Sequence, residues 1–227
     1  MSTDVDVILD SLQREFVANA DPHRAASMVA YMRDQFPYFG LPAPRLRLIS
    51  RTVRPLLAHP TQTQLTALVT RLWAMPEREF QYYALDEIQR HTQICRIDFL
   101  ETLETLIVTK SWWDTVDVLS RHGAGALVAR HPHLRSEMGR WLRSNNMWLV
   151  RSAILHQERY KVHTDSDWLF AACLHHAGNP EFFIRKAIGW ALRSYASVDL
   201  AAVQHFVEIH DAQLSGLSKR EALKRRL

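Results

Sequence analysis

The chain has 227 residues, of which 47% are hydrophobic, so it is long enough to bury a sizeable core. It has only 7 glycines and no long polar or low-complexity tract, which excludes an intrinsically disordered protein. The formal net charge is only +4, yet among the 28 basic residues only five are lysine. Arginine-rich composition fits an acidic partner with planar oxyanions such as phosphate, because a guanidinium offers a fork of donors. The alternative is a general preference for arginine over lysine in the source genome.

Two further features bound the class of protein. Cys95 and Cys173 form neither a metal-binding spacing nor a disulfide framework, and the 12 histidines lack carboxylate or cysteine partners at ligand spacing. We therefore expect no metal and no cofactor. The sequence has no signal peptide and no apolar run of about 18 residues. We expect a soluble, cytoplasmic protein with no membrane partner.

Apolar residues recur at helical spacing along almost the whole chain. The breaks are Phe36 to Pro42, a looser stretch at Gly123 and Gly125, and Asn145-Asn146. No segment alternates as a strand does, so the sequence predicts an all-α fold. The predicted helices carry the stripes Val5 to Phe16, Met28 to Met32 (after the cap Asp21-Pro22), Leu46 to Val53 (from Pro44), Leu65 to Trp73, Phe80 to Ile88 (from Pro76), Phe99 to Ile107 and Leu134 to Leu142.

The helices also repeat. Leu149 to Ile154 matches Phe183 to Ile188 at an offset of 34 residues, and Phe80 to Leu85 lies near twice that distance upstream of the first. Helix pairs with such a period are typical of an α-solenoid, in which each pair buries its apolar face on its neighbours. This architecture predicts that functional residues lie on one concave, polar face.

The stretch from Thr109 to Asp117 is the most informative segment. In a helix, Trp113 and Asp117 lie one turn apart on the same face. An aromatic ring beside a carboxylate suits a cationic substrate, because both offer negative potential. The alternative is that Trp112 and Trp113 are core residues and the two aspartates belong to a first-turn charge pattern.

The C-terminal segment contains Ser218-Lys219-Arg220-Glu221, which predicts a capping box at the start of a short basic helix that ends at Leu227. The free amides and basic side chains of this helix could hold a phosphate. A solvated tail is the alternative.

The chain resembles the AlkD family of DNA alkylation repair glycosylases from about residue 5 to its end. The resemblance rests on several sequence blocks, which stand in the same order as in that family. The longest block, which includes Gly189-Trp190, is the most specific. The blocks are Tyr31-Met32, Pro76 to Gln81, Lys110 to Asp117, Arg151 to Leu155, Phe182 to Arg193 and Leu217 to Ala222.

The resemblance implies a single HEAT-like helical repeat domain over residues 1–227 that hydrolyses the N-glycosidic bond of cationic N3- and N7-alkylpurines in duplex DNA. It places the catalytic aspartate at Asp117, the flanking tryptophans at Trp113 and Trp190, and the active-site arginine at Arg151. From the residues alone, Trp190 is also compatible with a core position, and Arg151 with either a phosphate contact or a structural ion pair. No lysine stands in this set, so we expect a monofunctional enzyme.

The expected partner is double-stranded DNA with alkylated purines, bound by a monomer that associates with the nucleoid. Besides Arg151, the candidate DNA-binding residues are Tyr31, Lys186, Arg193, Lys219 and Arg220. Lys186 and Arg193 are placed on the helix face of the second flanking tryptophan, where their charges can meet phosphates.

Two other classes of function remain at this stage. A DNA-binding scaffold without catalysis would keep a basic face for damaged or branched DNA. A HEAT-type protein-interaction array would instead expose apolar grooves. Base release from alkylated duplex separates the first from a glycosylase, and salt-dependent duplex binding separates the second.

Overall fold

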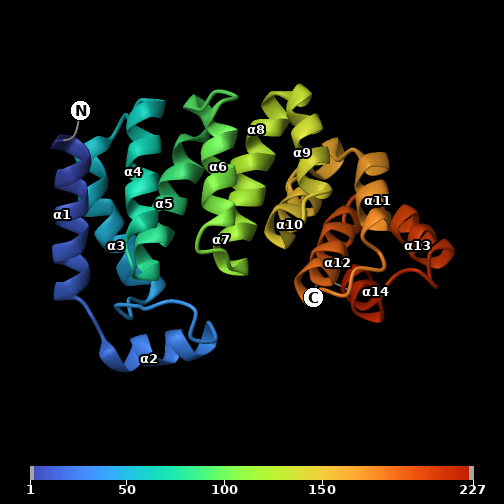
Figure 1. Cartoon of the computed structure of the whole chain (residues 1–227), viewed down its shortest axis with the longest axis horizontal. Coiled ribbons are helices and arrows are strands. Elements are labelled where there is room, and N and C mark those ends of the chain that lie inside the picture. The colour runs from blue at the N-terminus through green and yellow to red at the C-terminus, as the bar shows by residue number, and fades with distance from the viewer. Residues whose placement is uncertain (1–2, 225–227) are drawn as a thin grey trace. The chain divides into compact units, whose positions relative to one another are not determined.

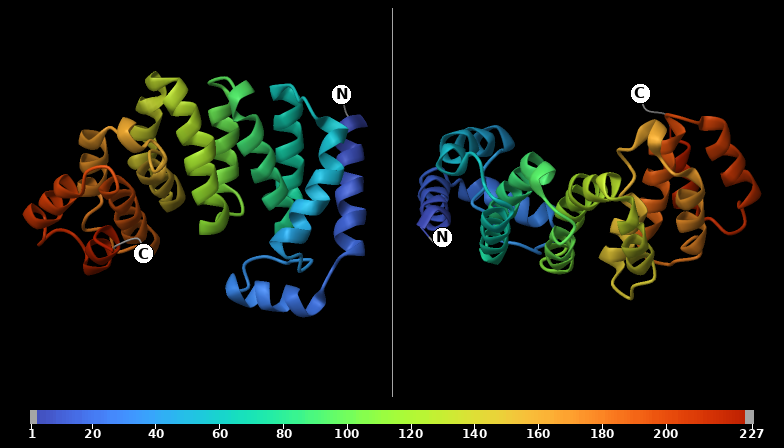
Figure 2. Two further views of the ribbon diagram at one scale, coloured as in Figure 1. Left: turned by 180° about the vertical axis from the view of Figure 1, so that it is seen from behind. Right: turned by 90° about the horizontal axis from the view of Figure 1, so that it is seen from above.

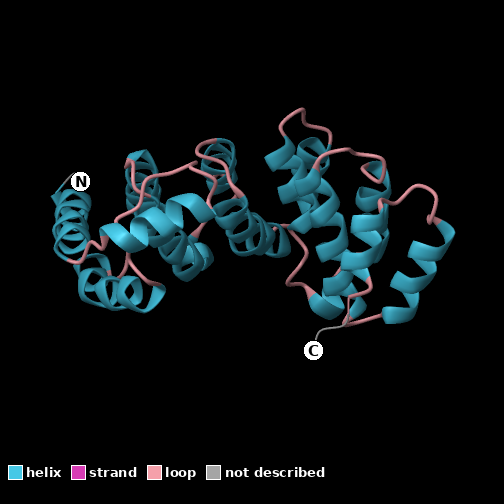
Figure 3. Cartoon of the chain, turned by 90° about the horizontal axis from the view of Figure 1, so that it is seen from below, coloured by secondary structure: helices cyan, strands magenta, loops and turns pink. Residues whose placement is uncertain are grey.

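A computed structural model describes residues 3–224, and every regular element within that range is a helix (Figures 1 and 3). The predicted all-α class is therefore confirmed. The chain divides into two compact units, residues 1–102 and 103–227, and the division falls inside helix α6 (Phe99–Val108). A single domain with one concave basic face stays a prediction.

In the first unit, α1 packs against α3 and α4. Helix α4 pairs with α5, and these two helices lie side by side in both views of Figure 2. The predicted stripes of this unit are buried except for Met28 to Met32, where only Met32 is buried, and Leu12, Phe16, Leu65 and Phe80 are fully inaccessible. Helix α2 begins at the predicted proline and its cap, but none of its own residues is buried. The elements are α1 (Thr3–Ala18), α2 (Pro22–Tyr31), α3 (Ala43–Val53), the 3-10 helix η1 (Arg54–Leu57), α4 (Gln62–Ala74), α5 (Arg78–His91) and the 3-10 helix η2 (Thr92–Ile94).

The predicted break at residues 36–42 is held by one carboxylate. Glu79 accepts hydrogen bonds from the backbone N–H groups of Phe39, Gly40 and Leu41 at 3.1, 2.8 and 3.1 Å. Burial raises the pKa of Glu79, and the backbone donors act in the opposite direction. The loop that returns from α2 is thus fixed to the start of α5.

In the second unit, α10 packs against α7, α9 and α12, and α12 packs against α13 and α14. Side-chain contacts recur near the predicted period of 34 residues. The Ser120 hydroxyl donates a hydrogen bond to the hydroxyl of Ser152, 32 residues further on. Nε2 of His176 lies 2.7 Å from the carbonyl oxygen of Leu142, 34 residues before it. The elements are α7 (Trp113–Val118), the π-helix η3 (Leu119–Ala124), α8 (Gly125–Arg130), the 3-10 helix η4 (Pro132–Leu134), α9 (Arg135–Leu142), α10 (Met147–Leu155), the 3-10 helix η5 (Lys161–His163), α11 (Ser166–His175), α12 (Phe182–Ala196), α13 (Leu200–Ile209) and α14 (Gly216–Ala222).

The expectation that Gly123 and Gly125 loosen the chain is wrong. Both lie in an uninterrupted helical run from α7 through η3 to α8. A Cβ on Gly125 would stand 2.1 Å from the carbonyl oxygen of His156. The glycine therefore permits close packing between this run and the end of α10.

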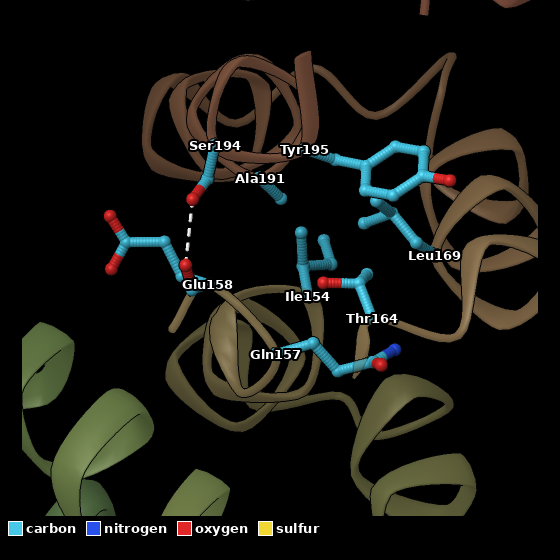
Figure 4. Close-up of a pocket in the computed structure, with 8 residues that line it drawn as sticks. All are labelled: Ile154, Gln157, Glu158, Thr164, Leu169, Ala191, Ser194 and Tyr195. Atoms are coloured by element: carbon cyan, nitrogen blue, oxygen red, sulfur yellow. Dashed lines mark hydrogen bonds between the residues drawn. The ribbon is translucent and has the colours of Figure 1, made fainter. Parts of the chain in front are cut away.

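A small pocket between α10, α11 and α12 shows how these helices are joined (Figure 4). Ile154, Leu169 and Ala191 line it, and they belong to the buried apolar core of this unit. At its edge the Ser194 hydroxyl donates to the backbone carbonyl of Glu158 at 2.6 Å. This contact ties α12 to the chain that follows α10.

Candidate active site

Helix α7 presents the central pair of residues. Trp112 caps the helix in an extended conformation, with φ −157° and ψ 160°, and the helix begins at Trp113. Trp113 is half-buried, whereas Asp117, one turn further on, is only 5% exposed. The predicted helix and its spacing are confirmed. Trp112 is also half-buried, and its ring packs on the rings of Trp148 and Phe183.

Asp117 forms a two-pronged ion pair with Arg151 of α10. The Nε of Arg151 donates to Oδ1 at 2.7 Å, and Nη2 donates to Oδ2 at 2.8 Å. Arg151 is 1% exposed. Two buried charges of opposite sign with parallel hydrogen bonds balance each other, whereas either one alone would carry a large desolvation cost. The position of each carboxylate oxygen is therefore set by the arginine.

The same guanidinium also reaches α12. Its Nη1 donates to the backbone carbonyl of Phe183. Its central carbon lies 5.2 Å from the centroid of the Trp190 ring and 5.9 Å from that of Phe183. These distances are typical of cation–π contacts. Arg151 thus connects the carboxylate on α7 with the indole on α12, and its donors are directed into the protein.

Trp190 is half-buried and is held at its nitrogen. Its Nε1–H donates to Oε2 of Glu221 on α14 at 3.0 Å. The same carboxylate binds Nζ of Lys186 at 2.6 Å and Nη1 of Arg193 at 2.9 Å. Hydrogen bonding from Lys186, followed by the indole and the charges of the two bases, lowers the pKa of Glu221 against the effect of burial.

Gly189 allows α14 to come this close. A Cβ at this position would stand 2.4 Å from Cβ of Glu221 and 2.9 Å from the carbonyl oxygen of Ser218. The Ser218 hydroxyl in turn donates to the carbonyl of Arg185 at 2.9 Å. Helix α14 is therefore seated on α12 by backbone approach as well as by side chains.

The remaining candidates are placed as follows. Tyr31 ends α2 in the first unit and is 72% exposed. Lys219 forms an ion pair with Asp211 at 2.6 Å, and Arg220 is exposed on α14. Lys186 and Arg193 do share the helix face of Trp190, as predicted.

The capping box predicted at Ser218 is wrong. Helix α14 begins at Gly216, and its cap is Ser215, whose side chain accepts from the N–H of Ser218 at 3.0 Å. Ser218 is buried inside the helix. The helix ends at Ala222, and residues 225–227 of the predicted basic helix lie outside the described residues.

The family model described as DNA alkylation repair enzyme matches residues 12–225. The chain belongs to this family. A solved structure described as a predicted DNA alkylation repair enzyme from Enterococcus faecalis is 30% identical, with a TM-score of 0.83, and the match covers 90% of this chain and 95% of that chain. No curated protein sequence matches.

Membership of the DNA alkylation repair enzyme family supports an enzyme that acts in the repair of alkylated DNA, with DNA as its substrate. Over the described residues, no cluster of three or more histidine, cysteine or acidic side chains could hold a metal ion. In that same part of the chain, no helix has the length and apolar character needed to span a bilayer.

Sequence reasoning missed two residues of the site. Glu221 was assigned to a helix cap, although it follows Trp190 by 31 residues, close to the repeat period that would have indicated a contact. Arg121 is not among the residues that the sequence predicts for the site. It stands one turn after Asp117, and its Nε donates to the carbonyl of Asp117 at 2.8 Å while Nη1 donates to Glu158 at 3.0 Å.

Proposed function

We propose that this member of the family is an AlkD-like, monofunctional DNA glycosylase that hydrolyses the N-glycosidic bond of cationic N3- and N7-alkylpurines in duplex DNA. The observation that carries the proposal is the carboxylate of Asp117, held in a fixed orientation by Arg151 and accompanied on its own helix by Trp113. The guanidinium of Arg151 also lies 5.2 Å from the centroid of the Trp190 ring.

Hydrolysis of the N-glycosidic bond of a cationic purine requires few groups besides this carboxylate. Alkylation at N3 or N7 gives the purine a positive charge, so the base can leave with the bonding electron pair without being protonated. Charge then develops on the sugar. A carboxylate about 4 Å from that charge, at an effective dielectric near 20, contributes roughly 4 kcal/mol. This corresponds to about three decades in rate.

Water completes the reaction at C1′. Its oxygen forms the new bond to C1′ as the bond to the purine nitrogen breaks, and its proton passes to Asp117 or to solvent. The pair with Arg151 uses one lone pair on each carboxylate oxygen and leaves another on each for the water and the sugar. Asp117 therefore acts both as counter-charge and as the group that orients water.

The indoles of Trp113 and Trp190 would present negative π faces to the cationic base and sugar. The geometry of Arg151 favours positioning of Asp117 over the alternative of a phosphate contact, because the guanidinium is buried and its donors point to Asp117 and Phe183. Phosphates would be met by more exposed basic residues such as Arg220.

The deciding experiment is release of free base from a duplex that contains one N7-methylguanine, measured under single-turnover conditions. We expect stoichiometric release of N7-methylguanine and an intact abasic strand. Duplex binding without any release, from this substrate and from an N3-methyladenine duplex, would favour the non-catalytic DNA-binding scaffold.

A further inference from the structure

The carboxylate of Glu221 on α14 contacts Trp190 of the candidate active site, and it is not needed to hold α14 against α12. Helix α14 is already held by the close approach at Gly189, by the bond from Ser218 to Arg185 and by the buried Ala222. None of these contacts needs a carboxylate. The carboxylate of Glu221 instead accepts three donors from the face of α12 that carries Trp190.

The bond to the indole has a geometric consequence. An indole has a single N–H donor, so a bond at Nε1 fixes the rotation of the ring about its side-chain torsions. The ring so fixed lies 5.2 Å from the guanidinium of Arg151, which in turn holds both oxygens of Asp117. A chain of contacts therefore runs from Glu221 through Trp190 and Arg151 to the carboxylate.

The two basic partners of Glu221 give the contact a second effect. Lys186 Nζ lies 5.8 Å from the centroid of the Trp190 ring, and Arg193 bonds the same carboxylate oxygen as the indole. Glu221 thus holds both cations beside the indole, with the Lys186 amine over the ring. A neutral residue at position 221 would release them toward solvent and toward phosphates.

We propose that Glu221 is a positioning residue of this site, which fixes the Trp190 indole through its Nε1–H and keeps Lys186 and Arg193 beside the ring. The inference rests on the proposed glycosylase function for its kinetic consequence, but its structural part does not. Glu221 touches no reacting atom and acts through Trp190.

The kinetic test compares Glu221→Ala with Asp211→Ala. Asp211→Ala removes the ion pair between Asp211 and Lys219 of α14, and it is the matched control for a loosened helix. We expect Glu221→Ala to lower the single-turnover excision rate at saturating enzyme about tenfold, because a misplaced group is costly in a preorganised site. Duplex affinity should stay the same or increase, because two cations are released. Asp211→Ala should retain the excision rate.

The background variant Trp190→Phe shows whether the effect passes through the indole. Phenylalanine keeps an aromatic ring but has no N–H, so Glu221→Ala should cause little further loss of rate in that background. An equal tenfold loss in both backgrounds, or the same loss in Asp211→Ala, would overturn the proposal.

A spectroscopic measurement is independent of any activity. Of the 7 tryptophans, the one whose indole N–H resonance disappears in Trp190→Phe is assigned to that residue. We expect this resonance to shift upfield in Glu221→Ala and to stay in place in Asp211→Ala. If the wild-type protein releases no base, the proposed function fails while this shift still tests the contact. A resonance that does not move in Glu221→Ala would refute the positioning role.

A second variant reaches the same contact through the backbone. Gly189→Ala places a methyl group where Glu221 and Ser218 now stand, so α14 must move and the indole resonance must shift. Gly178→Ala is its control, because a Cβ there meets no atom within 4 Å. An unshifted resonance in a folded Gly189→Ala variant would also count against the proposal.

Discussion

Arg151 donates hydrogen bonds to both carboxylate oxygens of Asp117, which precedes it by 34 residues, with donor–acceptor distances of 2.7 and 2.8 Å. Both partners are buried, at 1% and 5% exposure. Because each side chain compensates the charge of the other, neither can be removed without a structural cost to the partner. A substitution at either position is therefore expected to affect the stability of the protein as well as its activity.

The first prediction concerns the carboxylate. Asp117→Asn should lower the single-turnover excision rate by about two to four decades with little change in duplex affinity, because the charge matters mainly in the transition state. Asp114→Asn is the internal control, since position 114 points about 60° away from the Asp117 face of the helix. Near-normal excision by a folded Asp117→Asn variant would remove this residue from the mechanism.

The second prediction separates the two roles considered for Arg151. If it positions Asp117, Arg151→Ala should lower the unfolding free energy by about 3–5 kcal/mol, because a buried carboxylate loses its partner. The slope of log K for duplex binding against log salt should not change. A slope reduced by about one unit would instead identify a phosphate contact. Urea unfolding and binding titrations at several salt concentrations measure both quantities.

The third prediction concerns the lesions that can be processed. The set of Trp113, Asp117, Arg151 and Trp190 contains no amine to form a Schiff base and no evident general acid. The Lys186 amine beside Trp190 is paired with Glu221 at 2.6 Å. Uracil and hypoxanthine should therefore be released poorly or not at all, and borohydride should trap no covalent complex. A bulky substituent on a cationic purine should be tolerated better than a small one on a neutral base. Rapid release of uracil, or strand cleavage coupled to base loss, is incompatible with the mechanism.

The fourth prediction concerns acid sensitivity. His156 is buried, with Nδ1 2.6 Å from the carbonyl oxygen of Ala153, and burial lowers its pKa from 6.5 to about 4. The unfolded chain binds a proton at higher pH than the folded chain does, so stability is lost as the pH falls from 6.5 toward 4. The loss reaches roughly 3 kcal/mol for one such histidine.

Urea unfolding between pH 7 and 4 measures this slope. His156→Gln should flatten it, whereas His23→Gln, at an exposed position, should not. Part of the slope should remain, because burial also lowers the pKa of His122 to about 4. A slope unchanged in His156→Gln would show that this imidazole is not the source.

The sequence predicted those parts of the fold that depend on local periodicity. The helix with Trp113 and Asp117 on one face follows from a spacing of four residues, and the all-α class follows from stripes such as Leu65 to Trp73. Helix ends were less certain. Pro76 was expected to open a helix that in fact begins at Arg78, whose N–H bonds the carbonyl of Pro37 at 3.0 Å.

The partners of the site residues were harder to predict, because they depend on how each helix is rotated against the next. Nothing in the spacing of Asp117 and Arg151 required the guanidinium to point inward rather than to solvent. Glu221 matched a local capping pattern, yet its tertiary partners on α12 determine its contacts. The catalytic and DNA-binding roles of these residues stay predictions.

The contact between Trp190 and Glu221 can form only late during synthesis of this segment. Ribosomes add residues from the N-terminus, so a growing chain contains Asp117, Arg151 and Trp190 well before residue 221 is made. Until α14 emerges and docks, the indole lacks the acceptor at its nitrogen, and Lys186 and Arg193 lack their shared counter-charge. On the proposed role of Glu221, a nascent chain in which α14 has not yet docked would hold the Trp190 indole less precisely, and its excision rate would rise once that helix is in place.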